Sequence, residues 1–181
     1  SVPADRLLAA LVPPRHFADA SFATYCANPA FPSQQATVDR LTEVAAQLTG
    51  SSGGVFKRLK ARKTPPAVYL DGGFGVGKTH LLTSLAHSVG AGASAYGTFV
   101  EYTNLVGALG FAKTVEALST KTLVCIDEFE LDDPGDTVLM SRLLRELADR
   151  GVALAATSNT LPDSLGEGRF AAEDFLREIQ A

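Results

Sequence analysis

The sequence contains no tryptophan, one methionine and two cysteines among its 181 residues. So few thiols exclude the disulfide framework that stabilises many small secreted proteins. The two cysteines, Cys26 and Cys125, are also too far apart to form a CxxC metal motif. Because Cys125 lies within an apolar run, we expect both thiols to be reduced, as in a cytoplasmic protein.

Long apolar runs are missing as well. No stretch approaches the about 20 apolar residues that a membrane-spanning helix requires, and no secretory leader of a charged segment followed by an apolar one is present. We therefore expect a soluble, cytoplasmic protein with no transmembrane segment. The formal net charge is only −4, which argues against DNA binding over the whole surface and leaves a local basic patch as the route to DNA.

Glycine, by contrast, is concentrated between Gly72 and Thr79, where the chain reads Gly-Gly-Phe-Gly-Val-Gly-Lys-Thr. This is the spacing of a phosphate-binding loop, in which the glycines let successive backbone N–H groups face the phosphates. Lys78 is expected to reach the β and γ oxygens, and the Thr79 hydroxyl to bind Mg²⁺. The motif therefore predicts binding of ATP or GTP with Mg²⁺. The candidate nucleotide-binding residues are Gly72, Gly73, Phe74, Gly75, Val76, Gly77, Lys78, Thr79 and His80.

The sequence on either side of this loop fits the same interpretation. Residues 67–70 are apolar and predict a buried strand, and residues 79–89 carry leucines at helical spacing. The phosphates would then lie at a helix N-terminus, where unpaired N–H groups and the helix dipole favour anions. The alternative is a glycine-rich hairpin turn, which would need neither the lysine nor the helix.

Strand-like and helical segments alternate along the rest of the chain, which has 46% hydrophobic residues. This pattern predicts one α/β domain with a parallel sheet flanked by helices. The expected strands cover residues 67–70, 98–102, 122–128 and 151–157. The expected helices cover residues 33–48, 79–89, 103–118, 134–149 and 171–180.

Two carboxylates, Asp127 and Glu128, end the apolar run that begins at Thr122. Ligands bind in open α/β sheets at the carboxyl ends of the strands, so we expect this pair to face the phosphate loop. Asp127 is the candidate to hold Mg²⁺, and Glu128 the candidate catalytic base that polarises the attacking water. A base at this position favours hydrolysis, with water as the phosphate acceptor, over a kinase reaction with another acceptor. The alternative is a surface acidic pair that caps the following helix.

A third motif follows the strand expected over residues 151–157, where the chain reads Ala-Ala-Thr-Ser-Asn and ends at Asn159. An amide at this place could reach the γ-phosphate or the lytic water and so report whether the phosphate is there. By itself, the Ser-Asn pair would be explained more simply as a turn. Its position after the first two motifs favours the functional interpretation.

The three motifs in this order resemble the AAA+ ATPases, with Walker A at 72–79, Walker B at 123–128 and sensor 1 at Asn159. Shorter phrases resemble, more narrowly, the ZapE family of bacterial cell-division ATPases and its mitochondrial relatives. These phrases lie at residues 17–25, 32–34, 69–73, 125–129 and 156–159. The resemblance covers the chain from about Pro14 onward.

This resemblance implies a P-loop NTPase of the AAA+ type with two parts. Residues 1–50 would form an N-terminal arm and a helix that pack on the core, with Phe17, Phe22 and Tyr25 as the packing side chains. Residues 51–181 would form the ATPase core, and the C-terminal lid would lie beyond Ala181. The segment from Pro32 to Gln34 is a candidate to flank the adenine.

The resemblance also implies Mg²⁺-dependent ATP hydrolysis, with Lys78, Glu128 and Asn159 as catalytic residues. It implies a homo-oligomer in which an arginine of one subunit completes the site of its neighbour; Arg169 is the candidate to act in trans, and Arg177 the fallback. The implied role is remodelling or regulation of a protein partner in cell division, with FtsZ as that partner and the division site as the location.

Two other functions stay open. The first is a DNA-replication initiator or helicase loader, which has the same AAA+ core. The run from Lys57 to Lys63 has five cations in seven residues and would serve DNA binding, although a solvated surface is the simpler explanation. The second is a nucleotide-dependent binding module with little turnover.

Overall fold

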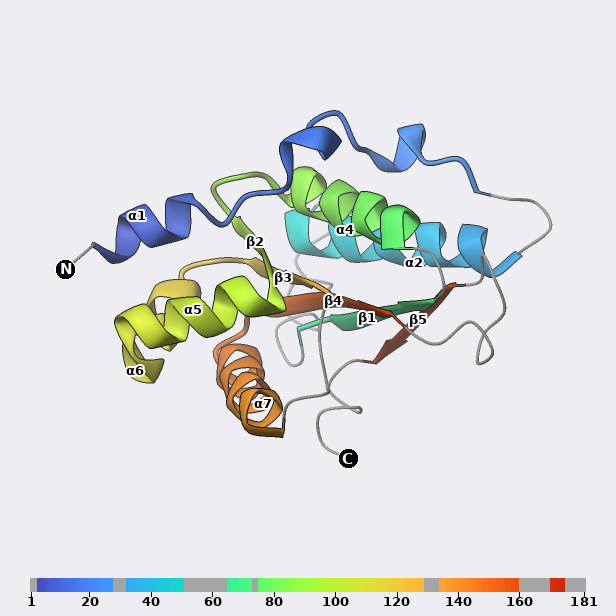
Figure 1. Cartoon of the computed structure of the whole chain (residues 1–181). Helices are drawn as coiled ribbons and strands as arrows, with labels where there is room; N and C mark the ends of the chain where they lie inside the picture. Colours follow the sequence, from blue (N-terminus) through green and yellow to red (C-terminus); the bar gives the residue numbers. More distant parts are fainter. Residues whose placement is uncertain are drawn as a thin grey trace.

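A sheet between two layers of helices forms the centre of the fold (Figure 1). The computed structural model describes residues 3–27, 32–50, 65–72, 75–128, 134–159 and 170–174. Within them the sheet has the strand order β2-β3-β4-β1-β5. The strands are β1 (Ala67–Gly72), β2 (Ser94–Thr98), β3 (Leu123–Asp127), β4 (Ala153–Asn159) and β5 (Phe170–Asp174). The helices are α1 (Ala4–Ala9), α2 (Pro32–Thr49), α4 (Gly75–Val89), α5 (Phe99–Leu109), α6 (Phe111–Leu118) and α7 (Pro134–Asp149), with short 3-10 turns η1 (Arg15–Phe17) and η2 (Phe22–Thr24).

Strands β1 to β4 are parallel to one another, and helices connect them. This arrangement confirms the predicted parallel sheet flanked by helices. Parallel strands all end at the same edge, so the carboxyl ends of β1, β3 and β4 lie together. The motifs that the sequence places after these three strands therefore meet at one edge of the sheet.

The C-terminal part of the described chain differs from the sequence-based expectation. A helix was expected over residues 171–180, but residues 170–174 form β5, which pairs antiparallel with β1. The edge of β1 would otherwise present unpaired N–H and C=O groups, and a strand there satisfies them. Helical spacing over so short a segment was outweighed by this non-local pairing. Residues 175–181 lie outside the described residues.

The strand expected over residues 98–102 is also wrong, because β2 ends at Thr98 and α5 begins at Phe99. The Thr98 hydroxyl accepts a hydrogen bond from the backbone N–H of Glu101, and the Glu101 carboxylate accepts one from the N–H of Thr98. This capping box starts the helix at the point where the apolar pattern alone suggested a strand. A single helix was expected up to Leu118, but Gly110, at φ 83°, separates α5 from α6.

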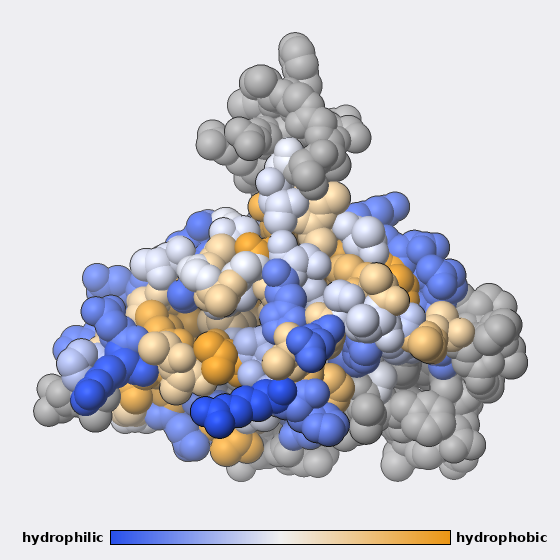
Figure 2. Space-filling model, turned by 90° about the horizontal axis from the view of Figure 1, so that it is seen from above, coloured by the Kyte–Doolittle hydropathy of each residue, from blue (hydrophilic) through white to orange (hydrophobic). Residues whose placement is uncertain are grey.

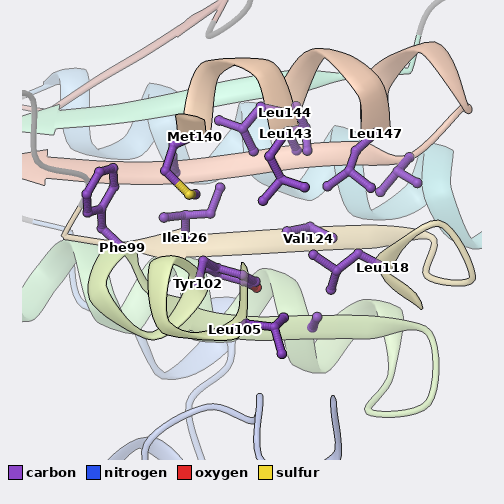
Figure 3. Close-up of a cluster of buried hydrophobic side chains, with 14 of the residues drawn as sticks. Phe99, Tyr102, Leu105, Leu118, Val124, Ile126, Met140, Leu143, Leu144 and Leu147 are labelled. Atoms are coloured by element: carbon purple, nitrogen blue, oxygen red, sulfur yellow. The ribbon is translucent and has the colours of Figure 1, made fainter. Parts of the chain in front are cut away.

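The core lies on both faces of the sheet, because successive side chains of a strand point to opposite sides. In β3, Val124 and Ile126 pack with α5, α6 and α7 (Figure 3), whereas Leu123 and Cys125 pack with α2 and α4. Both cysteines are free thiols, as the sequence predicts. From the side of α2 and α4, Figure 2 shows apolar residues interspersed among polar ones.

The N-terminal segment contacts the outer edge of the sheet at β2. The backbone N–H of Tyr96 in β2 donates to the carbonyl of Leu11 at 3.0 Å, and Leu11 is buried in the core on the α5 side. Helix α1 precedes this contact and was not anticipated from the sequence. None of the helices in the described part of the chain combines the length and apolar character that a membrane crossing requires.

Candidate functional site

The glycine-rich loop connects a strand to a helix, as the motif requires. Gly72 is the last residue of β1 and Gly75 the first of α4, while Gly73 and Phe74 lie outside the described residues. The neighbouring strand β4 ends beside it, since Asn159 pairs in register with Gly72. The structure therefore brings the backbone of the third motif next to the start of the first.

Lys78 lies in the first turns of α4, and its side chain is directed toward the end of β4. It is only 1% exposed, and its amine donates a hydrogen bond to the backbone carbonyl of Ser158. The Ser158 hydroxyl in turn accepts a hydrogen bond from Tyr69 of β1. The cation of the first motif is therefore held at the carboxyl end of β4, in contact with the third motif.

The first and second motifs are joined by direct contact. The hydroxyl of Thr79 donates to Oδ2 of Asp127 at 2.9 Å, although the two residues are 48 positions apart. Asp127 ends β3 and is 6% exposed. The pair thus supplies a hydroxyl and a carboxylate oxygen at one place, and oxygen ligands of this kind suit Mg²⁺.

Few other groups in the described residues could bind a metal. They contain no cluster of three or more His, Cys, Asp or Glu side chains that could hold an ion by themselves. Mg²⁺ commonly uses one or two protein ligands together with substrate phosphates and water. The donor set of Thr79 and Asp127 fits an ion that arrives with a nucleotide.

The Asp127 carboxylate has two further partners that sequence reasoning missed. Tyr96, in β2, donates to Oδ2 at 2.6 Å, and Thr157, in β4, donates to Oδ1 at 2.5 Å. Burial, and then the adjacent Asp127 carboxylate, raise the pKa of the Tyr96 hydroxyl well above its ordinary value, so it remains a donor. No signal in the sequence pointed to Tyr96, which precedes the strand expected over residues 98–102, whereas Thr157 is the last residue of the strand expected over residues 151–157.

Glu128 has an unusual backbone conformation for a non-glycine residue, with φ at 54°. Its N–H donates to the Thr157 hydroxyl at 3.0 Å, and its side chain is exposed. A side chain in this left-handed region costs about 1 to 2 kcal/mol, so the surrounding hydrogen bonds must maintain it. Strain of this kind is typical of functional sites.

The imidazole of His80 contacts the N-terminal segment. Its Nε2 lies 3.1 Å from the Thr24 hydroxyl and 3.2 Å from the carbonyl of Ser21. The rings of Phe17 and Tyr25 pack against it edge-on, with centroids 6.2 and 5.5 Å away. The prediction that these aromatic residues pack on the main domain is confirmed, and Phe22 packs with the core on the α4 side.

Three predicted features lie outside the described residues. They are the candidate trans-acting Arg169, its fallback Arg177 and the basic run from Lys57 to Lys63. Of the segment proposed to flank the adenine, Gln34 is buried and its side-chain oxygen accepts a hydrogen bond from Tyr25 at 3.4 Å.

Comparison with known proteins identifies the family. The model of the AFG1-like ATPase family matches residues 1–181. The chain belongs to this family. This AFG1-like protein is 29% identical over 136 residues to the cell division protein ZapE of Escherichia coli K12, an alignment that covers 69% of this chain and 36% of ZapE. It is also 26% identical over 135 residues to an uncharacterised protein of Schizosaccharomyces pombe, covering 62% of this chain and 28% of that protein. The predicted ZapE-like AAA+ family is thereby confirmed. The chain spans about a third of the length of these relatives.

Solved structures establish the fold of this AFG1-like protein. AMPPCP-bound DnaA from Aquifex aeolicus superposes with a TM-score of 0.61 at 11% identity, covering 90% of this chain and 48% of that one. Domain III of the Thermotoga maritima replication initiation protein DnaA gives 0.60 at 21% identity, covering 90% and 64%. The chain has the P-loop NTPase fold of the AAA+ type, as the sequence predicts.

Proposed function

We propose that this AFG1-like protein hydrolyses ATP in a Mg²⁺-dependent reaction. The observation that carries the proposal is the 2.9 Å hydrogen bond from Thr79 to Asp127. It joins the phosphate loop to the carboxylate motif, and the buried amine of Lys78 lies at the same edge of the sheet. A hydroxyl, a carboxylate and a cation held together in this way match what Mg²⁺ and a triphosphate need.

Each residue has a distinct role in this proposal. The backbone of the loop from Gly72 to Thr79 and the start of α4 bind the phosphates, with Lys78 offsetting the charge of the β and γ oxygens. Thr79 and Asp127 hold Mg²⁺, which when bound neutralises charge that develops on the phosphates. The exposed carboxylate of Glu128 accepts a proton from the attacking water. Asn159, paired with Gly72, contacts the γ-phosphate or that water.

The exchange of Glu128 for Gln tests the hydrolytic role. Removing the base should lower the rate of phosphate release in the presence of Mg²⁺ by at least about 100-fold, with nucleotide affinity nearly unchanged. Glu116→Gln is the matched control, because it makes the same change at an exposed position on α6. Phosphate release with no added acceptor would also distinguish hydrolysis from a kinase reaction.

The outcomes separate three possibilities. Rapid hydrolysis by the Glu128→Gln protein would remove Glu128 from the base role. A native protein that binds ATP tightly without releasing phosphate would instead be a nucleotide-dependent binding module. Absence of nucleotide binding altogether would overturn the proposal.

We further propose a homo-oligomer that acts on a protein partner in cell division, with Arg169 completing the site of a neighbouring subunit. The relative ZapE is named as a cell division protein, which makes FtsZ the partner to test first. ATPase rate per subunit should rise with protein concentration if the site is shared, and should respond to added FtsZ. A flat concentration profile would contradict the role of Arg169 in trans.

The alternative function is replication initiation or helicase loading. It is favoured by the basic run between Lys57 and Lys63 in a chain whose fold resembles DnaA. This function predicts salt-dependent binding of single-stranded DNA that is lost when the run is neutralised. No DNA binding at low salt would exclude it.

A further inference from the structure

One oxygen of the Asp127 carboxylate serves two hydroxyl groups. Oδ2 accepts from Thr79 at 2.9 Å and from Tyr96 at 2.6 Å. Thr79 belongs to the phosphate loop motif, whereas Tyr96 lies in β2, on the far side of β3 from β4 and β1. The tyrosine therefore reaches the candidate metal site from an element that contains none of the three motifs.

The other oxygen of the carboxylate is restrained separately. Oδ1 accepts from the hydroxyl of Thr157 at 2.5 Å and from the N–H of Glu128 at 3.1 Å. Each oxygen thus has its own pair of donors, and the plane of the carboxylate is fixed by contacts on both sides. Without Tyr96, Oδ2 would keep its contact with Thr79, whose hydroxyl is itself a candidate metal ligand.

We propose that Tyr96 is a positioning residue for the metal site, holding Oδ2 of Asp127 beside the Thr79 hydroxyl so that the two can bind Mg²⁺ together. This inference rests on the proposed Mg²⁺-dependent function. Tyr96 does not touch the nucleotide in this scheme and acts through Asp127 alone. Hydrogen-bonding partners of metal ligands commonly change metal affinity by 10- to 100-fold when they are removed.

The location of Tyr96 explains why a phenol is needed there. The ring is 3% exposed and packs with the apolar residues of α4, a role that phenylalanine would fill equally well. A buried hydroxyl, however, must find a partner, and the nearly buried carboxylate must find donors. The hydrogen bond satisfies both needs, so its effect falls on Asp127 rather than on packing.

Tyr102 offers a closely matched control. It is 0% exposed, and its hydroxyl donates to the backbone carbonyl of Cys125 at 2.9 Å, also in β3. Its ring lies on the other face of the sheet, in the core shared by α5 and α7 (Figure 3). Tyr102→Phe and Tyr96→Phe therefore each remove one buried hydroxyl that donates a hydrogen bond to β3. Only Tyr96→Phe removes a donor to Asp127.

The test measures AMPPCP binding by calorimetry as Mg²⁺ is titrated, and again in EDTA. Tyr96→Phe should raise the Mg²⁺ concentration for half-maximal enhancement of binding by about tenfold, with affinity in EDTA unchanged. Tyr102→Phe should alter neither value. In an Asp127→Asn background, Tyr96→Phe should cause no further change, because the carboxylate it positions is gone.

The remaining outcomes overturn the inference in recognisable ways. An unchanged Mg²⁺ midpoint for Tyr96→Phe, or an equal shift for Tyr102→Phe, would reduce Tyr96 to a packing residue. A shift that persists in the Asp127→Asn background would lead to the same conclusion. This comparison also tests the inference if Tyr96→Phe folds poorly in the native background. A native protein whose nucleotide binding ignores Mg²⁺ would overturn the proposed function itself, and the inference with it.

Discussion

Thr157 connects the two acidic residues at the end of β3. Its hydroxyl donates to Oδ1 of Asp127 at 2.5 Å and accepts from the N–H of Glu128 at 3.0 Å. The second bond fixes the backbone of Glu128, whose φ of 54° is unfavourable for a side-chain-bearing residue. One buried hydroxyl thereby supports both the candidate metal ligand and the candidate base.

We predict that Thr157→Val lowers the ATPase rate by at least about tenfold and the free energy of unfolding by about 1 to 3 kcal/mol. The buried Asp127 carboxylate would lose a donor, and the Glu128 N–H would lose the nearer of its two acceptors. Phosphate release and urea unfolding measure the two effects. Thr157→Ser is the control, because it keeps the hydroxyl and loses only the methyl group; an equal loss of rate in both variants would contradict a specific role of the hydroxyl.

At the scale of elements, the contact between β2 and the N-terminal segment depends on the absence of a side chain at Gly97. A Cβ atom there would lie 2.9 Å from Cδ2 of Leu11 and 3.2 Å from Cε2 of Tyr102. Leu11 could move, but Tyr102 is held by its hydrogen bond to β3. With any residue other than glycine at position 97, helix α5 and the N-terminal segment could not approach β2 so closely.

Gly97→Ala should destabilise the protein by about 1 to 3 kcal/mol, because the added methyl group overpacks this contact. Gly107→Ala is the opposite case, since Gly107 lies within α5 and an added Cβ would meet nothing within 4 Å. It should stabilise the protein by about 0.5 to 1 kcal/mol, the difference in helix propensity. Urea unfolding of both variants checks the signs, and a Gly97→Ala protein as stable as the native one would contradict the close approach.

At the scale of the whole molecule, several ionisable side chains are buried in neutral form. Burial, and then the Asp127 carboxylate, raise the pKa of Cys125 well above its ordinary value of 9.0. Burial likewise raises the pKa of Tyr102 above its ordinary value of 10.0. Above pH 9 the unfolded chain therefore releases protons that the native protein keeps, so stability must fall as the pH rises.

We predict that the free energy of unfolding is nearly independent of these groups at neutral pH and decreases above about pH 9. Cys125 contributes a loss of up to about 1.4 kcal/mol per pH unit there. Urea unfolding between about pH 7.5 and 10.5 measures the slope. Cys125→Ala should make the slope shallower by that amount, whatever its stability at neutral pH; equal slopes would contradict a buried, neutral thiol.

Several parts of this fold were predictable because they depend on residues close together in the chain. Helix α7 begins at Pro134 and ends at Asp149 as expected, and β1 and β3 lie within a residue or two of their predicted bounds. Proline at a helix start and short apolar runs are local signals. The errors at Thr98 and at residues 170–174 arose where a cap or a strand partner outweighed the apolar pattern.

The chemical groups of the candidate site, and the strand and helix that present Lys78 and Thr79, follow from the sequence, because the motif's spacing is local. The groups that surround Asp127 depend instead on the tertiary fold. Tyr96 and Thr157 lie 31 and 30 residues from it, and they meet it because β2 and β4 are the neighbours of β3. Strand order is a non-local property set by how the whole sheet and its helices bury their apolar faces.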